Sequence, residues 1–238
     1  MKNKRVAILQ SNYIPWIGYF DIIDLVDEFI IYDEMQYTKN DWRNRNKIKT
    51  PNGLQWLTIP VENTGHISRK ISETKITDKK WFRKHWNSIR LNYAKAPYFK
   101  VYKDVFESLY KECEQEEYIS NVNYKFIKKI NEILGITTKI SYDTDYGLID
   151  GKTERLVDLC KKAGATEYLS GPAAKNYIDE NLFNQAGIKL IWMDYSHYKE
   201  YPQLFPPFEQ GVSVLDLIFN CGEDSKKMLT EKVEMVKR

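Results

Sequence analysis

Two short stretches of the chain carry side chains that could bind a sugar or a phosphate, and each follows an apolar run. The first begins at Gln10 and ends at Gly18. Amides and aromatic rings in one loop suit sugar or base binding, because such rings can face both apolar walls and polar ligands. The candidate substrate-binding residues here are Gln10, Asn12, Tyr13, Trp16 and Gly18. The alternative is a buried aromatic corner that packs a strand onto a helix.

The second stretch, residues 33–47, is polar, aromatic and basic. Arg43 and Arg45 carry planar, fork-shaped donors that suit phosphate or carboxylate groups. Asp33 and Glu34 at the preceding strand end could hold a ribose hydroxyl, a metal or these same arginines. The candidate substrate-binding residues here are Gln36, Trp42, Arg43 and Arg45. The alternative is a solvated, salt-bridged loop.

A third candidate is the turn at Ser170 and Gly171, which follows a predicted strand and opens a predicted helix. Free N–H groups at a helix start bind anions, and Ser170 can cap such a helix. An ordinary connection between strand and helix is the alternative.

Three side chains are candidates for a catalytic general base: His85, His197 and Asp33. Histidine changes charge near neutral pH and is the commonest general base. His197 lies in a tyrosine-rich loop, where a hydrogen-bonded packing role is the commoner use. No metal site is expected, since the three histidines and three cysteines lack zinc spacing. The nucleotide, hydrolase and metalloprotease motifs GxxxxGK[ST], GxGxxG, GxSxG and HExxH are also missing.

Strands and helices must bring these stretches together. The apolar runs 6–9 and 28–32 flank an amphipathic helix at 17–26, which is a βαβ unit. Further strands are expected at 54–61, 67–76 (weaker), 137–142, 166–170 and 188–193. Further helices are expected at 78–93, 98–113, 119–134, 152–163, 176–186, 212–219 and 225–237. The carboxyl ends of parallel strands share one edge of a sheet, so we expect the three binding stretches to line one cleft.

The sequence therefore predicts an α/β fold with a mostly parallel, Rossmann-like sheet and an inserted, largely helical region. Residues 1–50 and 135–238 would form the α/β core, and 51–134 the inserted β-hairpin and helices. One continuous domain is the alternative, because a chain of 238 residues allows either.

Composition narrows the class of protein. The net charge of +3 with interspersed signs argues against a nucleic-acid binder. Three scattered cysteines are typical of reduced thiols in the cytoplasm. The apolar run near the N-terminus is too short for a signal peptide, and no run reaches the ~20 apolar residues of a membrane span. We expect a cytoplasmic protein without integral membrane contact, and a homodimer is compatible with the sequence.

Taken together, the stretches resemble the WbqC family found in bacterial surface-polysaccharide loci. The resemblance covers essentially the whole chain and is carried by residues 10–20, 33–37, 42–46, 56–61, 168–171 and 213–220. The family usually has proline where Ser11 stands. The resemblance implies a role in O-antigen or capsule sugar biosynthesis, and it supplies no catalytic residues.

A weaker likeness in the placement of loops is to the nucleotidylyltransferase superfamily that includes pantothenate synthetase. The histidines of that superfamily's first motif are missing, since Tyr13, Trp16 and Gly18 stand there.

Three functions follow from these residues and likenesses. The first is an enzyme that acylates or aminoacylates the amine of an amino-sugar nucleotide, with acyl-CoA or an ATP-activated acid as donor. The second is an ATP-dependent amide ligase, and the third is a nucleotide-sugar binding protein without catalysis.

Overall fold

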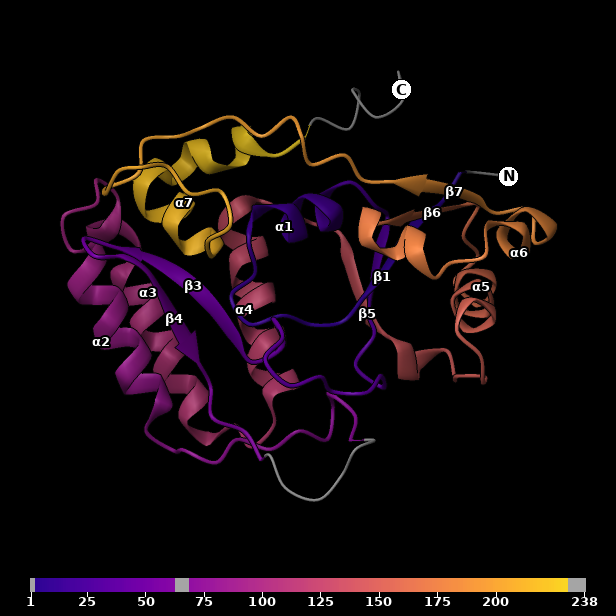
Figure 1. Ribbon diagram of the computed structural model, residues 1–238, viewed down its shortest axis with the longest axis horizontal. Coiled ribbons are helices and arrows are strands. Elements are labelled where there is room, and N and C mark those ends of the chain that lie inside the picture. The colour runs from indigo at the N-terminus through magenta and orange to yellow at the C-terminus, as the bar shows by residue number, and fades with distance from the viewer. Residues whose placement is uncertain (1–2, 63–68, 231–238) are drawn as a thin grey trace.

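The structure is a computed structural model that describes residues 3–62 and 69–230 (Figure 1). Its centre is a parallel sheet of five strands in the order β5-β2-β1-β6-β7. The strands are β1 (Arg5–Leu9), β2 (Glu28–Ile31), β5 (Lys139–Tyr142), β6 (Glu167–Ser170) and β7 (Lys189–Trp192). Every neighbouring pair of strands is parallel, which confirms the predicted α/β fold with a Rossmann-like sheet.

The sheet separates two hydrophobic cores. Side chains alternate along β1, so Ala7 belongs to one core while Val6 and Ile8 belong to the other. The larger core packs against α1 (Ile17–Asp24), α2 (Trp81–Tyr93), α3 (Phe99–Glu112), α4 (Ile119–Leu134) and α7 (Val214–Cys221). The smaller core packs against α5 (Thr153–Lys162) and α6 (Glu180–Gln185). Burial on both faces explains why β1 and β2 are apolar runs.

The strand order places a switch point beside β1. From β1 the chain proceeds outward through β2 to β5, and it later returns to the other side of β1 with β6 and then β7. In open sheets of this kind, ligands bind outside the carboxyl ends of the strands where the direction of winding reverses. Here that position lies between the ends of β1 and β6.

A two-stranded antiparallel hairpin lies outside this sheet, next to α2 and α7 (Figure 1). It consists of β3 (Arg45–Thr50) and β4 (Gly53–Thr58). The predicted strand 54–61 corresponds to β4, whereas no strand is predicted over the residues of β3. The hairpin crosses the predicted boundary at residue 50, and the larger core contains residues from both sides of it. The division into domains stays a prediction.

The other departures from the predicted elements are local. The strand 67–76 is wrong within the described residues 69–76, which form only isolated bridges, and 67–68 lie outside them. The helix predicted over 176–186 is shorter than expected: α6 spans Glu180–Gln185, and a 3-10 turn at Pro172–Asn176 precedes it. The terminal helix 225–237 is a 3-10 segment at Gly222–Met228, and residues 231–237 lie outside the described ranges. Among the described helices, none combines the length and apolar character of a membrane span.

Candidate functional site

The site lies at the carboxyl end of β1 and is centred on Arg43. The Arg43 Nη1 donates to Asn12 Oδ1, and its Nη2 donates to Gln10 Oε1 at 2.7 Å. Both amides directly follow β1, so the first two predicted binding stretches do meet at this edge. The side chain of Arg43 is only 14% exposed. The loop after β1 therefore holds one guanidinium in a fixed orientation beside the switch point.

The hydrogen-bond partners of the Arg43 guanidinium are mainly neutral groups. Its hydrogen-bond acceptors on Asn12 and Gln10 carry no charge, and the Asp41 carboxylate is 3.7 Å away. That carboxylate also accepts hydrogen bonds from Thr38 Oγ1 and the Trp42 N–H. Burial would raise the pKa of Asp41, but the charge of Arg43 and these hydrogen bonds lower it. A fixed cation that is incompletely neutralised is suited to bind an anionic ligand group.

The turn after β6 approaches the same cation. Burial raises the pKa of Tyr177, while the positive charge of Arg43 lowers it, so the two side chains lie within electrostatic reach. Tyr177 is 59% exposed. Ser170 is buried and hydrogen-bonds the Tyr168 side chain, and Gly171 precedes the 3-10 turn. The helix predicted over 176–186 begins only at Glu180, after the 3-10 turn, so Ser170 does not cap it. The anion-binding role of the turn stays a prediction. Whether the three stretches line one cleft stays a prediction.

Hydrogen bonds from the hairpin fix the first loop, residues 10–18. Asn46 of β3 donates from Nδ2 to the carbonyls of Tyr13, at 3.2 Å, and Ile14, at 2.8 Å. The Tyr13 N–H donates to the Trp42 carbonyl at 3.0 Å. Ile14 has φ of +38°, which a branched side chain rarely adopts, so these bonds hold a strained turn. The loop that carries Asn12 is thus tied to the segment that carries Arg43.

Asp33 anchors the same loop from the neighbouring strand. It is buried and accepts hydrogen bonds from the Ser11 N–H at 2.8 Å, from Ser11 Oγ at 2.6 Å and from Ser120 Oγ. Burial raises the pKa of Asp33, and these hydrogen bonds oppose that shift. Asn123 completes the network by donating to Ser11 Oγ and to the Arg43 carbonyl. The arrangement gives Asp33 a positioning role, and its predicted role as a base stays untested.

His85 lies in the core beneath Tyr13. Its Nδ1 is 2.8 Å from the Tyr13 hydroxyl, and its Nε2 is 3.1 Å from the Thr58 carbonyl. The carbonyl can only accept, so Nε2 carries the proton and Nδ1 accepts from Tyr13. The Tyr110 hydroxyl, 2.7 Å away, then donates to Tyr13. Burial lowers the pKa of His85 to about 4, so the ring is neutral and fully engaged.

His197 is placed elsewhere, beside the last described residues. Its Nε2 contacts Thr230 Oγ1 and lies 3.8 Å from the Asp21 carboxylate. Tyr198 and Thr230 also donate to that carboxylate. No contact of the described residues joins His197 to Arg43 or to His85. The two predicted histidine bases therefore belong to separate networks.

Trp16 and Gly18 form a packed corner. The Trp16 ring makes edge contacts with Tyr195 and Tyr198, at centroid distances of 5.0 and 5.7 Å. A Cβ on Gly18 would lie 2.3 Å from Trp16 Cζ2. Gly18 is therefore required for the close approach of the indole. The Tyr195 hydroxyl lies 3.5 Å from the position of a Cβ on Gly171, which joins this corner to the turn after β6.

The remaining predicted residues lie on the hairpin side. Trp42 and Trp56 are each 42% exposed, and Arg45 stacks over Trp56 with 4.2 Å between guanidinium carbon and ring centroid. Arg45 therefore points along the hairpin, while Arg43 points to the first loop. Gln36 is exposed and its backbone bridges Lys70.

Sequence reasoning missed Arg155 of α5. Burial raises the pKa of Tyr32 at the end of β2, and Arg155 lowers it through its charge and a hydrogen bond. Arg155 Nη1 also contacts Met35 Sδ at 3.2 Å. No spacing signal marks this arginine, because it reaches the sheet edge from a helix more than 120 residues later. Within residues 3–62 and 69–230, no group of three His, Cys, Asp or Glu side chains could hold a metal ion.

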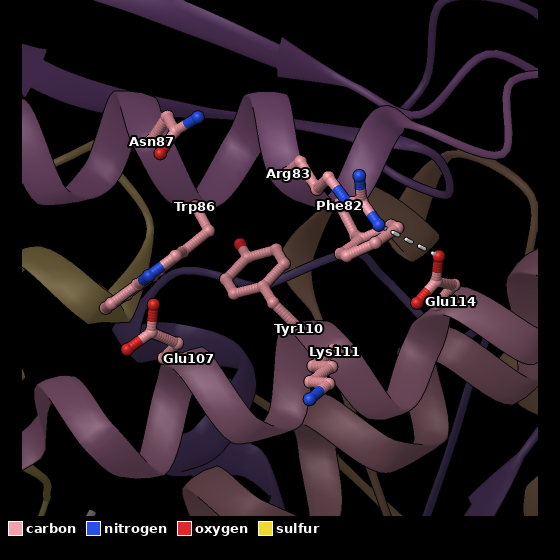
Figure 2. A pocket seen from close by; sticks show the side chains of 8 residues that line it. All are labelled: Phe82, Arg83, Trp86, Asn87, Glu107, Tyr110, Lys111 and Glu114. Carbon is pink, nitrogen blue, oxygen red and sulfur yellow. Dashed lines mark hydrogen bonds and ion pairs between the residues drawn. The ribbon is translucent and has the colours of Figure 1, made fainter.

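A separate hollow of about 290 Å³ lies between α2 and α3 (Figure 2). Its lining residues are Phe82, Arg83, Trp86, Asn87, Glu107, Tyr110, Lys111 and Glu114. Figure 2 shows the ion pair between Arg83 and Glu114, 3.4 Å apart, at one end of the hollow. The hydrogen bond from Tyr110 to Tyr13 connects the hollow to the first loop.

Comparisons with known proteins agree with this description at the level of family. The chain is 50% identical to "Uncharacterized protein Rv1507c" of Mycobacterium tuberculosis (strain ATCC 25618 / H37Rv) over 226 residues, which cover 95% of this chain and 97% of the relative. No solved structure matches. The model of the WbqC-like protein family matches residues 10–228, a range that includes every candidate residue described above. The chain therefore belongs to the WbqC-like protein family.

Proposed function

We propose that this chain is a cytoplasmic enzyme of bacterial surface-polysaccharide biosynthesis that acts on an amino-sugar nucleotide, by N-acyl or aminoacyl transfer. The single observation that supports a phosphate-bearing substrate is the Arg43 guanidinium, held by Asn12 and Gln10 at the switch point. A nucleotide sugar carries two phosphates, whose oxygens match the two-pronged geometry of an arginine.

The proposed reaction joins the sugar amine to an acyl carbon. The neutral amine nitrogen attacks the acyl carbonyl, a C–N bond forms, and the bond from carbon to the thiol of coenzyme A, or to AMP, breaks. The amine loses one proton to a base. Arg43 would hold the diphosphate away from the reacting amine, so it would position the substrate without taking part in the bond changes.

The first test is binding of a UDP- or dTDP-linked amino sugar by calorimetry to wild type and to Arg43→Lys. Lysine keeps the charge but loses the planar, two-pronged guanidinium that suits a phosphate. We expect the affinity to fall about tenfold or more, since a hydrogen bond to a charged group contributes about 1.5–3 kcal/mol. Equal affinity of both proteins would contradict the proposal.

Arg5→Lys provides a matched control. Arg5 begins β1, at the opposite end of the strand from Gln10, and pairs with Glu167 at 2.7 Å. This variant should bind the nucleotide sugar as wild type does. Melting temperatures of both variants, measured without ligand, separate loss of binding from loss of stability.

The second test is turnover, followed by mass spectrometry. The protein is incubated with an amino-sugar nucleotide and either an acyl-CoA or ATP with a free acid. Acylated product from acyl-CoA supports the transferase, and product that forms only with ATP supports the amide ligase. Binding without product under either condition, across a panel of amino-sugar nucleotides, would assign the chain to the non-catalytic binding proteins.

A further inference from the structure

Two exposed tryptophans are in contact at the outer face of the β3–β4 hairpin: Trp56 on β4 and Trp42 in the turn before β3. Trp42 and Trp56 are each 42% exposed, and their ring centroids are 5.5 Å apart with 34° between the planes. Single exposed hydrophobic residues are normal on protein surfaces, but a pair of the largest aromatic side chains in contact is not explained by chance exposure.

The strand register places two cations on the same face. Lys47 lies opposite Trp56 in the hairpin, and Arg45 lies opposite Thr58. The Lys47 Nζ is 5.0 Å from the Trp56 centroid and 5.9 Å from that of Trp42. Side chains alternate along a strand, and the intervening Asn46 faces the first loop and is buried. The outer face therefore combines aromatic rings with positive charge.

Arg45 is anchored at the edge of this face. Its Nη2 donates to the Asn40 carbonyl, but its Nε is buried and has no hydrogen-bond partner. Aromatic rings beside cations are the combination that proteins use to bind bases and their phosphates, through stacking and charge.

We propose that Trp42 is the stacking surface for the base of a nucleoside diphosphate whose phosphates lie on Arg43. This inference rests on the proposed function, because it uses the same phosphate site. Aromatic pairs pack with centroids about 4.5–7 Å apart, so a separation of 5.5 Å leaves no room for a third ring between Trp42 and Trp56. The base must stack from outside. Arg45 stacks on Trp56, so we place the base on Trp42.

Chain connectivity joins this surface to the phosphate site. Trp42 directly precedes Arg43, and consecutive Cα atoms are about 3.8 Å apart. The Trp42 backbone is fixed by its carbonyl, which accepts from the Tyr13 N–H, and by its N–H, which donates to Asp41 at 2.7 Å. We place the base on Trp42 and the diphosphate on Arg43, which are neighbouring residues of this fixed segment.

The test compares UDP with inorganic pyrophosphate, which lacks a base, by calorimetry on the full chain. Trp42→Ala should weaken UDP binding at least about fivefold, because base–aromatic stacking contributes about 1–3 kcal/mol per base. Pyrophosphate binding should not change. Trp42→Phe should recover part of the UDP affinity. Leu54→Ala, which changes another exposed side chain of β4, is the control and should bind both ligands as wild type does.

The outcomes separate the two proposals. If Trp42→Ala weakens UDP alone, but no amino-sugar nucleotide is ever acylated, the stacking surface stands and the proposed transferase falls. If Arg43→Lys weakens both ligands and Trp42→Ala weakens neither, the stacking surface is overturned and the phosphate site stands. If wild type binds neither ligand, both are overturned.

Discussion

Gly18 allows the Trp16 indole to cover the first turn of α1, and its role can be tested. A Cβ at residue 18 would meet the Trp16 ring at 2.3 Å. We expect Gly18→Ala to displace the indole from Tyr195 and Tyr198, and to lower the free energy of unfolding by about 1–3 kcal/mol. Chemical denaturation measures this change.

A double-mutant cycle distinguishes the steric clash of Gly18→Ala with Trp16 from its effect on helix propensity. In a Trp16→Leu background the smaller side chain can move away, so Gly18→Ala should cost less than it does in wild type. The two changes should therefore be non-additive in a double-mutant cycle. Additive effects would show that the ring contact is not what requires glycine.

At the scale of single residues, the sequence indicated which types could do chemistry but not where they point. An arginine after a strand end suits anions, and Arg43 does face the first loop. Arg45 is two residues away and has the same chemistry, yet it stacks on Trp56. The residue type of His85 suits a general base, but its partner Tyr13 is 72 residues away in sequence. Such contacts depend on tertiary packing, which residue type does not encode.

At the scale of elements, Asn46 of β3 joins the hairpin to the first loop, and a second prediction follows. Asn46→Ala removes both donors to the carbonyls of Tyr13 and Ile14 and leaves them buried. We expect a loss of about 1–3 kcal/mol of stability and weaker nucleotide-sugar binding, because the loop that carries Asn12 is released. Calorimetry and thermal unfolding measure the two effects.

Asn92→Ala is a control for that prediction. Asn92 also donates from Nδ2 to a carbonyl, that of Ser88, but within α2 and away from the first loop. It should leave ligand affinity unchanged. If Asn46→Ala lowered stability without changing affinity, the hairpin would support the fold but not the geometry of the site.

The difference between α4 and β3 shows which elements can be predicted from a sequence. The helix α4 begins and ends where predicted, because its apolar residues recur at helical spacing and Gly135 closes it at φ of +64°. In β3 the buried positions include Asn46 and Lys49, so no apolar alternation marks the strand. Lys49 is buried because its Nζ finds the Pro207 carbonyl, a partner far along the chain.

At the scale of the molecule, the parallel sheet could be predicted because its central strands are apolar runs separated by a helix. The strand order could not, since several orders satisfy the same pattern of strands and helices. The order matters for function: it places β6 beside β1 and so sets the switch point next to Gln10 and Asn12. The pairing that defines the site arises between strands about 160 residues apart.

The same sheet contains a buried ion cluster that predicts the response to acid. Glu28 of β2 is fully buried and accepts from Lys4 Nζ at 2.7 Å, Lys139 Nζ at 2.9 Å, Ser141 Oγ at 2.6 Å and the Tyr146 hydroxyl. Burial would raise the pKa of Glu28, but these hydrogen bonds outweigh it and lower the pKa to about 2, from 4.5. The cluster joins β1, β2 and β5 through one carboxylate.

Because the folded pKa lies below the unfolded value, the charged carboxylate stabilises the fold. That stabilisation is fully present above about pH 4.5 and is lost as the pH falls toward 2. It corresponds to about 3 kcal/mol, and Glu28→Gln should remove it. At pH 7 the variant should therefore be less stable than wild type, and the difference should shrink steadily between pH 4.5 and 2.

Taking the difference between the two proteins isolates Glu28 from other groups. Burial lowers the pKa of His85 to about 4, so this residue lowers the stability of the fold as the pH falls from 6.5 to 4. Burial and nearby carboxylates raise the pKa of Asp143 to about 6, so this residue raises the stability of the fold as the pH falls over much of the same range. Both act equally in wild type and variant, so they cancel in the difference. Denaturation curves at pH 7, 5, 4 and 3 would contradict the prediction if the gap between wild type and Glu28→Gln stayed constant.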